Sequence, residues 1–156
     1  MISEKLKNIK ILFFDLGGVV FNSYDLNPGD IQKINEMLAG IKHRADKSGI
    51  RVGIISSFDE SIVEQFKDSG ITDLYSSSID KVSTVQSLIL LYDYNFSEIA
   101  YIGNDLLDLP LLSKCGFSAA PSTARREVKR AVDYVGKSSS KSVLLEVLDL
   151  IEKNKY

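Results

Sequence analysis

The chain has 156 residues, which is long enough to bury a substantial core, and we expect one domain over residues 1–156. Its formal net charge is −2, so no basic field indicates nucleic-acid binding, and no apolar stretch approaches the ~20 residues that a membrane span needs. The single cysteine, Cys115, cannot form an internal disulfide. We therefore expect a cytoplasmic protein that binds neither nucleic acid nor membranes.

Strand-like apolar runs alternate with helical patterns along the whole chain. In chain order, the patterns predict a strand at 9–14, a helix at 31–47, a strand at 51–56, a helix at 60–68, a strand at 71–77, a helix at 81–92, a strand at 99–103, a helical segment at 104–116, a strand at 117–121, a helix at 125–131, a short strand at 133–136 and a helix at 142–153. Asp30 is the expected N-cap of the first of these helices. The segment 19–21 either continues the first strand or starts a short excursion, and 137–142 is expected to be a surface loop.

Repeated strand–helix units with short turns predict an α/β fold, a doubly wound parallel sheet with helices on both faces. In this architecture the loops that follow the carboxyl ends of the strands converge on one crevice. The polar residues that follow predicted strands are Asp15, Ser56, Lys81, Asn104, Asp105 and Asp108. We expect these side chains to meet at one edge of the sheet.

These residue types suit phosphoryl transfer. A carboxylate such as Asp15 can attack phosphorus and form an aspartyl-phosphate, which divides one difficult displacement into two easier steps. A hydroxyl (Ser56) can hold a phosphoryl oxygen, and an ammonium (Lys81) can neutralise its charge. Carboxylate and amide oxygens are also ligands that Mg²⁺ accepts, together with water and a phosphate oxygen.

Simpler interpretations exist for most of these residues. Asp15 could be only a turn residue beside glycine, and Lys81 could be a solvated lysine at a helix start. Asp105 equally suits an N-cap of the helix that follows Gly103. Asn104 and Asp108 fit either a metal site or its supporting contacts. The basic cluster at 124–130 is typical of an exposed helix face, with binding of an anionic substrate as the alternative.

Four motifs in order resemble those of the haloacid dehalogenase superfamily of phosphohydrolases. The matching stretches are "FFDLGGV" with Asp15, "GIISS" with Ser56, "DKVSTV" with Lys81 and "YIGNDLLDLPLL" with Asn104, Asp105 and Asp108. Within the superfamily, the chain is most similar to the capless branch of 3-deoxy-manno-octulosonate 8-phosphate phosphatases and related nonulosonate 9-phosphate phosphatases. The resemblance implies a Rossmann-like core without a large cap domain.

The resemblance also implies an activity, a cofactor and partners. It implies hydrolysis of a small phosphorylated metabolite such as a sugar-acid phosphate, with Asp15 as nucleophile and Ser56 and Lys81 holding the phosphoryl group. Mg²⁺ is the implied cofactor. Its implied ligands are Asp15, the Gly17 carbonyl and oxygens among Asn104, Asp105 and Asp108. Members of the branch form tetramers in which a neighbouring subunit closes the site, so a homo-oligomer is expected.

Gly17 departs from the family pattern. Most members carry a second aspartate at this place, two residues after the nucleophile, as general acid/base. The Gly17 carbonyl can still bind a metal, but no side chain remains to protonate a leaving alkoxide or to activate water. Loss of such a group typically costs ~10²–10⁴ in rate. The alternative function is therefore a weakened or inactive module of the same fold, with a role in assembly or regulation.

Overall fold

The computed structural model describes residues 2–22, 25–137 and 142–155, and within them a six-stranded, all-parallel sheet has the order β3-β2-β1-β4-β5-β6. The strands are β1 (Ile11–Phe14), β2 (Arg51–Ile55), β3 (Asp73–Tyr75), β4 (Ile99–Ile102), β5 (Phe117–Ala120) and β6 (Tyr134–Val135). The α-helices are α1 (Ile2–Lys7), α2 (Pro28–Lys47), α3 (Glu60–Val63), α4 (Lys81–Tyr92), α5 (Leu109–Lys114), α6 (Arg126–Ala131) and α7 (Val143–Lys155). Short 3₁₀ helices are η1 (Glu64–Ser69), η2 (Phe96–Glu98) and η3 (Leu106–Asp108).

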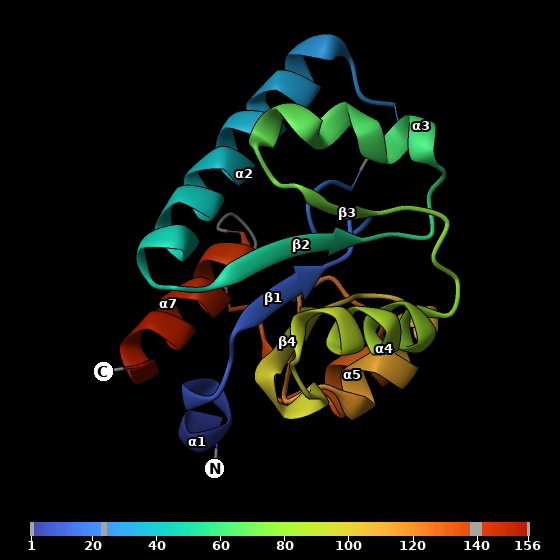
Figure 1. Cartoon of the computed structure of the whole chain (residues 1–156). Coiled ribbons are helices and arrows are strands. Elements are labelled where there is room, and N and C mark those ends of the chain that lie inside the picture. Colours follow the sequence, from blue (N-terminus) through green and yellow to red (C-terminus); the bar gives the residue numbers. More distant parts are fainter. Residues whose placement is uncertain (1, 23–24, 138–141, 156) are drawn as a thin grey trace.

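Helices cover both faces of the sheet, as predicted (Figure 1). Alternate residues of β1 point to opposite faces, so Leu12 and Phe14 pack with α1, α2 and α7, whereas Ile11 and Phe13 pack with α4, α5 and α6. All four residues are buried. A strand buried on both faces explains why the run reads as continuously apolar, and the prediction of a doubly wound parallel sheet is confirmed.

The register of the central strands aligns the ends where the candidate residues lie. Phe14 of β1 pairs with Ile54 of β2 on one side and with Ile102 of β4 on the other. The residues that follow β1, β2 and β4 therefore emerge next to one another at the same edge of the sheet.

The start of α2 corrects one prediction. Its N-cap is Asn27, whose Oδ1 accepts a hydrogen bond from the Asp30 backbone N–H at 2.8 Å. The Asp30 carboxylate accepts in return from the Asn27 N–H at 3.2 Å. Asp30 as N-cap was thus wrong because the helix begins at Pro28, a residue suited to the first turn, and Asp30 is the reciprocal partner of the cap.

Other elements differ from the sequence expectation in detail. Residues 17–21 form a short excursion with an isolated bridge between Gly17 and Phe21. The helix expected at 60–68 is divided into α3 and η1, while α1 and η2 were not predicted. Most of the expected loop at 137–142 lies outside the described residues. None of the described helices combines the length and apolar character needed to cross a bilayer.

Candidate active site

Asp15 lies directly after β1 and both of its carboxylate oxygens accept hydrogen bonds. Its backbone N–H donates to the Ile102 carbonyl at 3.1 Å, which continues the pairing of β1 with β4. Oδ1 accepts from the Leu16 N–H at 2.8 Å, and Oδ2 accepts from Lys81 Nζ at 2.8 Å. Asp15 is only 8% exposed. The carboxylate is therefore held in one orientation in a mostly dry environment.

Lys81, the first residue of α4, is buried rather than solvated. Its Nζ donates to Asp15 Oδ2 at 2.8 Å, to Asp108 Oδ1 at 2.5 Å and to the Tyr101 hydroxyl at 3.1 Å. The Lys81 residue is 3% exposed. A solvated surface lysine at this place is thus excluded, and the ammonium joins the end of β1 to the loop after β4.

Asp108 is fully buried and holds this loop together. Its Oδ1 accepts from Lys81 and, at 2.6 Å, from the Tyr101 hydroxyl. Its Oδ2 accepts from the backbone N–H groups of Asn104 at 3.0 Å and Asp105 at 3.1 Å. A Cβ at Gly103 would lie 2.6 Å from the Asp108 Cβ, so glycine is needed for this close approach. A metal ion could reach Asp108 only by displacing these donors.

Asn104 connects the loop after β4 to the turn after β1. Its side chain lies against Gly18, where an added Cβ would fall 1.8 Å from Asn104 Nδ2. Gly18 has a φ of 78°, in the left-handed region that favours glycine. The contact places the Asn104 amide beside the Gly17–Gly18 turn, and so on the same side of the site as Asp15.

Asp105 has the geometry of a helix cap. It precedes η3, and its Oδ1 accepts from the Leu106 N–H at 2.6 Å. Its side chain is 56% exposed and lies 3.8 Å from Arg125 Nε. The carboxylate therefore faces solvent and a basic side chain rather than Lys81, which supports the interpretation as a cap.

Ser56 follows β2 and is fully buried. Its backbone N–H donates to the Tyr75 carbonyl at 2.9 Å, and its Oγ accepts from the Phe58 N–H at 3.1 Å. Among the described residues, none accepts the proton of this hydroxyl. The Ser56 hydroxyl thus keeps a donor for another group, at the edge of the sheet where Asp15 lies.

The buried cluster carries excess negative charge, since two carboxylates (Asp15, Asp108) share one ammonium (Lys81). Burial raises the pKa of Asp15 to about 6; Lys81 opposes this increase, and the charge of Asp108 adds to it. A bound cation would offset the excess. Within the described ranges no three His, Cys, Asp or Glu side chains form a metal-binding group.

Tyr101 is the member of the cluster that sequence reasoning missed. It lies on β4, is fully buried, and contacts both Lys81 and Asp108 through its hydroxyl. Burial raises its pKa well above the usual value, so the hydroxyl stays protonated. The available signal was a tyrosine within a buried strand, because a buried tyrosine hydroxyl usually needs a polar partner.

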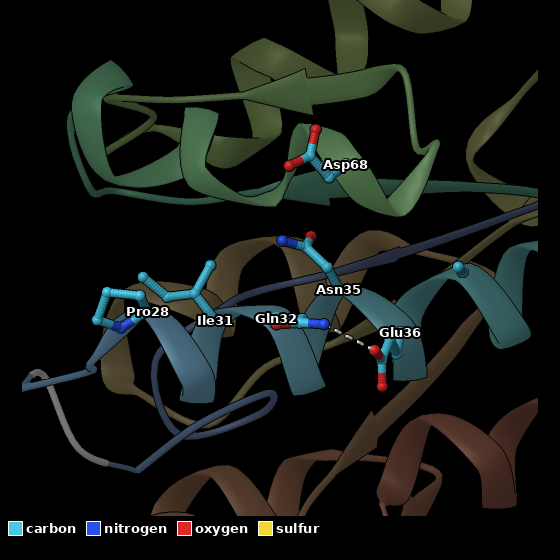
Figure 2. Close-up of a pocket in the computed structure, with 7 residues that line it drawn as sticks. Pro28, Ile31, Gln32, Asn35, Glu36 and Asp68 are labelled. Atoms are coloured by element: carbon cyan, nitrogen blue, oxygen red, sulfur yellow. Dashed lines mark hydrogen bonds between the residues drawn. The ribbon is translucent and has the colours of Figure 1, made fainter.

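A separate cavity of about 420 Å³ lies between α2 and η1 (Figure 2). Its polar lining includes Gln32, Asn35, Glu36 and Asp68, and none of the candidate site residues described above lines it. Asn35 Nδ2 donates to the Gln65 carbonyl at 3.0 Å, while its buried Oδ1 has no hydrogen-bond partner among the described residues. Two carboxylates without a basic group in the lining disfavour a phosphate ligand, so the candidate site remains the cluster around Asp15.

Two curated phosphatases are similar in sequence to this chain over most of its length. The chain is 32% identical to 3-deoxy-D-manno-octulosonate 8-phosphate phosphatase KdsC of Haemophilus influenzae over 95% of this chain and 85% of that protein. It is 31% identical to KdsC of Escherichia coli, covering 94% and 81% of the two chains.

Solved structures of similar proteins have the same fold. The cobalt-bound phosphatase of H. influenzae matches with a TM-score of 0.82 and 25% identity, covering 97% of this chain and 91% of that one. The phosphatase of Moraxella catarrhalis, in complex with magnesium, phosphate and KDO, matches with a TM-score of 0.78 and 24% identity, covering 99% and 91%. The profile of the haloacid dehalogenase-like hydrolases matches residues 5–148. The chain therefore belongs to the haloacid dehalogenase-like hydrolase family.

Proposed function

We propose that this protein is a Mg²⁺-dependent phosphatase that hydrolyses a sugar-acid phosphate, 3-deoxy-D-manno-octulosonate 8-phosphate or a close analogue. The observation that carries the proposal is the buried contact of Lys81 Nζ with Asp15 Oδ2, because it joins the predicted nucleophile to a cation at the strand edge. The similarity to the H. influenzae and E. coli phosphatases over more than nine-tenths of the chain supports the substrate class.

The residues present fit a magnesium ion. We assign its protein ligands to Asp15, the Gly17 carbonyl and the Asn104 side chain, since Asn104 lies against the turn that carries Gly17. Asp108 is left out because its oxygens already accept four hydrogen bonds. Asp105 is left out because its carboxylate caps η3. When bound, the ion supplies positive charge that stabilises the transferring phosphoryl group.

In the proposed reaction, a carboxylate oxygen of Asp15 attacks phosphorus while the bond from phosphorus to the sugar oxygen breaks. The Ser56 hydroxyl and the Lys81 ammonium bind the phosphoryl oxygens. Gly17 offers no acid, so the leaving alkoxide takes its proton from water. Water then attacks phosphorus of the aspartyl-phosphate, which releases inorganic phosphate and restores the Asp15 carboxylate.

The second candidate is an inactive module, and Gly17 is the observation that favours it. The two functions differ in phosphate release by the purified protein. We expect Mg²⁺-dependent release from 3-deoxy-D-manno-octulosonate 8-phosphate, faster than from neutral sugar phosphates such as glucose 6-phosphate. Release that is absent from every substrate, with or without Mg²⁺, would favour the inactive module. Equal rates for all sugar phosphates would refute only the substrate class.

The raised pKa of Asp15 predicts how metal binding depends on pH. A proton and Mg²⁺ compete for this carboxylate, and its pKa in the metal-free protein is about 6. Mg²⁺ affinity should therefore be nearly constant above about pH 7 and fall about tenfold per pH unit well below pH 6. Titration calorimetry between pH 5 and 8 would check this, with Asp15→Asn as the control that binds weakly throughout. An affinity that is equal at both ends of this range would contradict the assignment.

A further inference from the structure

The Tyr101 hydroxyl completes the set of acceptors around Lys81. It accepts a hydrogen bond from Lys81 Nζ at 3.1 Å and donates one to Asp108 Oδ1 at 2.6 Å, so it acts as both acceptor and donor. Because Tyr101 lies on the buried strand β4, the hydroxyl is fixed relative to the sheet. Tyr101 therefore holds Lys81 directly and also through Asp108.

This arrangement uses every donor of the lysine. An ammonium has three N–H donors, and those of Lys81 point to Asp15, Asp108 and Tyr101. Lys81 has no spare donor for a phosphoryl oxygen while all three contacts persist. One contact has to be given up during the reaction, and the identity of that contact decides how the lysine acts.

We propose that Tyr101 is a positioning residue. Together with Asp108 it holds Lys81 in place while the third N–H of Lys81 exchanges its hydrogen bond to Asp15 for one to the transferring phosphoryl group. When Asp15 forms its bond to phosphorus and the bond to the leaving oxygen breaks, the carboxylate loses its negative charge and becomes a weaker acceptor. The phosphoryl oxygens retain their negative charge, so the Lys81 N–H donates to them instead, and no proton leaves the lysine. This inference rests on the proposed phosphatase function.

Replacing Tyr101 with phenylalanine removes one of the two contacts that stay in place. Lys81 then has an unpaired buried donor, and its ammonium can rotate about the contact with Asp108. The ammonium is therefore less well aligned with the phosphoryl group in the transition state, while the substrate and metal sites remain. We expect kcat to fall about tenfold or more, with KM and Mg²⁺ affinity changed by less than about twofold.

Tyr92→Phe is the matched control. The Tyr92 hydroxyl donates to Asp73 Oδ1 at the same 2.6 Å, but the pair lies outside the candidate site. This variant should keep the wild-type kcat. An equal loss of kcat in both variants, or a Tyr101→Phe variant that changes KM alone, would overturn the positioning role.

NMR of the lysine side-chain ammonium groups gives a second readout that needs no activity. We expect a slowly exchanging ammonium signal in the wild type that disappears in Lys81→Gln, exchanges faster in Tyr101→Phe and is unchanged in Tyr92→Phe. A Lys81 ammonium that exchanges as fast as surface lysines in the wild type would overturn the inference even if Tyr101→Phe failed to fold. If the wild type releases no phosphate, the proposed function fails, and these signals still decide whether Tyr101 positions Lys81.

Discussion

Replacing Asp15 with asparagine should reduce phosphate release by about 10³-fold or more, because an amide cannot form the aspartyl-phosphate. The other carboxylate of the buried cluster, Asp108, is not available as a nucleophile, since donors from Lys81, Tyr101 and the backbone hold both of its oxygens. Steady-state phosphate release with saturating Mg²⁺ measures the effect. The fold should persist, because the change keeps the size of the side chain.

Asp73→Asn is the matched control for this variant. Asp73 is also a buried aspartate that pairs with a basic side chain, in this case Arg51 Nε at 2.9 Å, but it starts β3 away from the cluster. We expect this variant to retain phosphatase activity. Activity that survives in Asp15→Asn would contradict covalent catalysis by Asp15.

Restoring a carboxylate at position 17 should raise the turnover of alkyl phosphates by about 10²-fold or more. Gly17 has no side chain that could protonate the leaving oxygen, so we expect the parent protein to favour aryl and acyl phosphates, whose leaving groups need little protonation. In Gly17→Asp the ratio of aryl phosphate turnover to alkyl phosphate turnover should be smaller than in the parent. Parallel kinetics on an alkyl and an aryl phosphate measure both effects.

The backbone favours this experiment, because the glycines with left-handed φ among the described residues are Gly18, Gly49 and Gly70. Gly17 is not one of them, so an aspartate there does not require a left-handed conformation. Gly17→Asn provides a side chain of the same size without an acid, and it should show no gain. Equal turnover of alkyl phosphates by both variants and the parent would show that acid/base help is not what the site lacks.

The position of the site could be predicted from the sequence because it depends on topology. Apolar runs that end in polar residues mark buried parallel strands, and parallel strands bring their carboxyl ends to one edge. The proximity of Asp15, Ser56 and the loop after Gly103 can therefore be predicted without any knowledge of side-chain contacts.

The different structural roles of the carboxylates could not be predicted from the strand pattern. Asp105 and Asp108 are both acids in one short segment, yet one caps η3 at the surface and the other is buried against Lys81. The choice depends on the direction of the chain after Gly103, which brings two backbone N–H groups to Asp108. The role of Tyr101 likewise depends on a contact between residues 20 positions apart, which local patterns do not contain.

The central claim is that Asp15 accepts the phosphoryl group, and trapping the phosphorylated protein tests it most directly. Without an acid/base at position 17, hydrolysis of the intermediate should be slow, so it should accumulate on a substrate with a good leaving group. We expect wild-type protein mixed with radiolabelled acetyl phosphate and Mg²⁺, then quenched in acid, to carry label that hydroxylamine removes. Asp15→Asn should carry none. Phosphate release by the wild type with no label on the protein, or the same label on Asp15→Asn, would contradict the account.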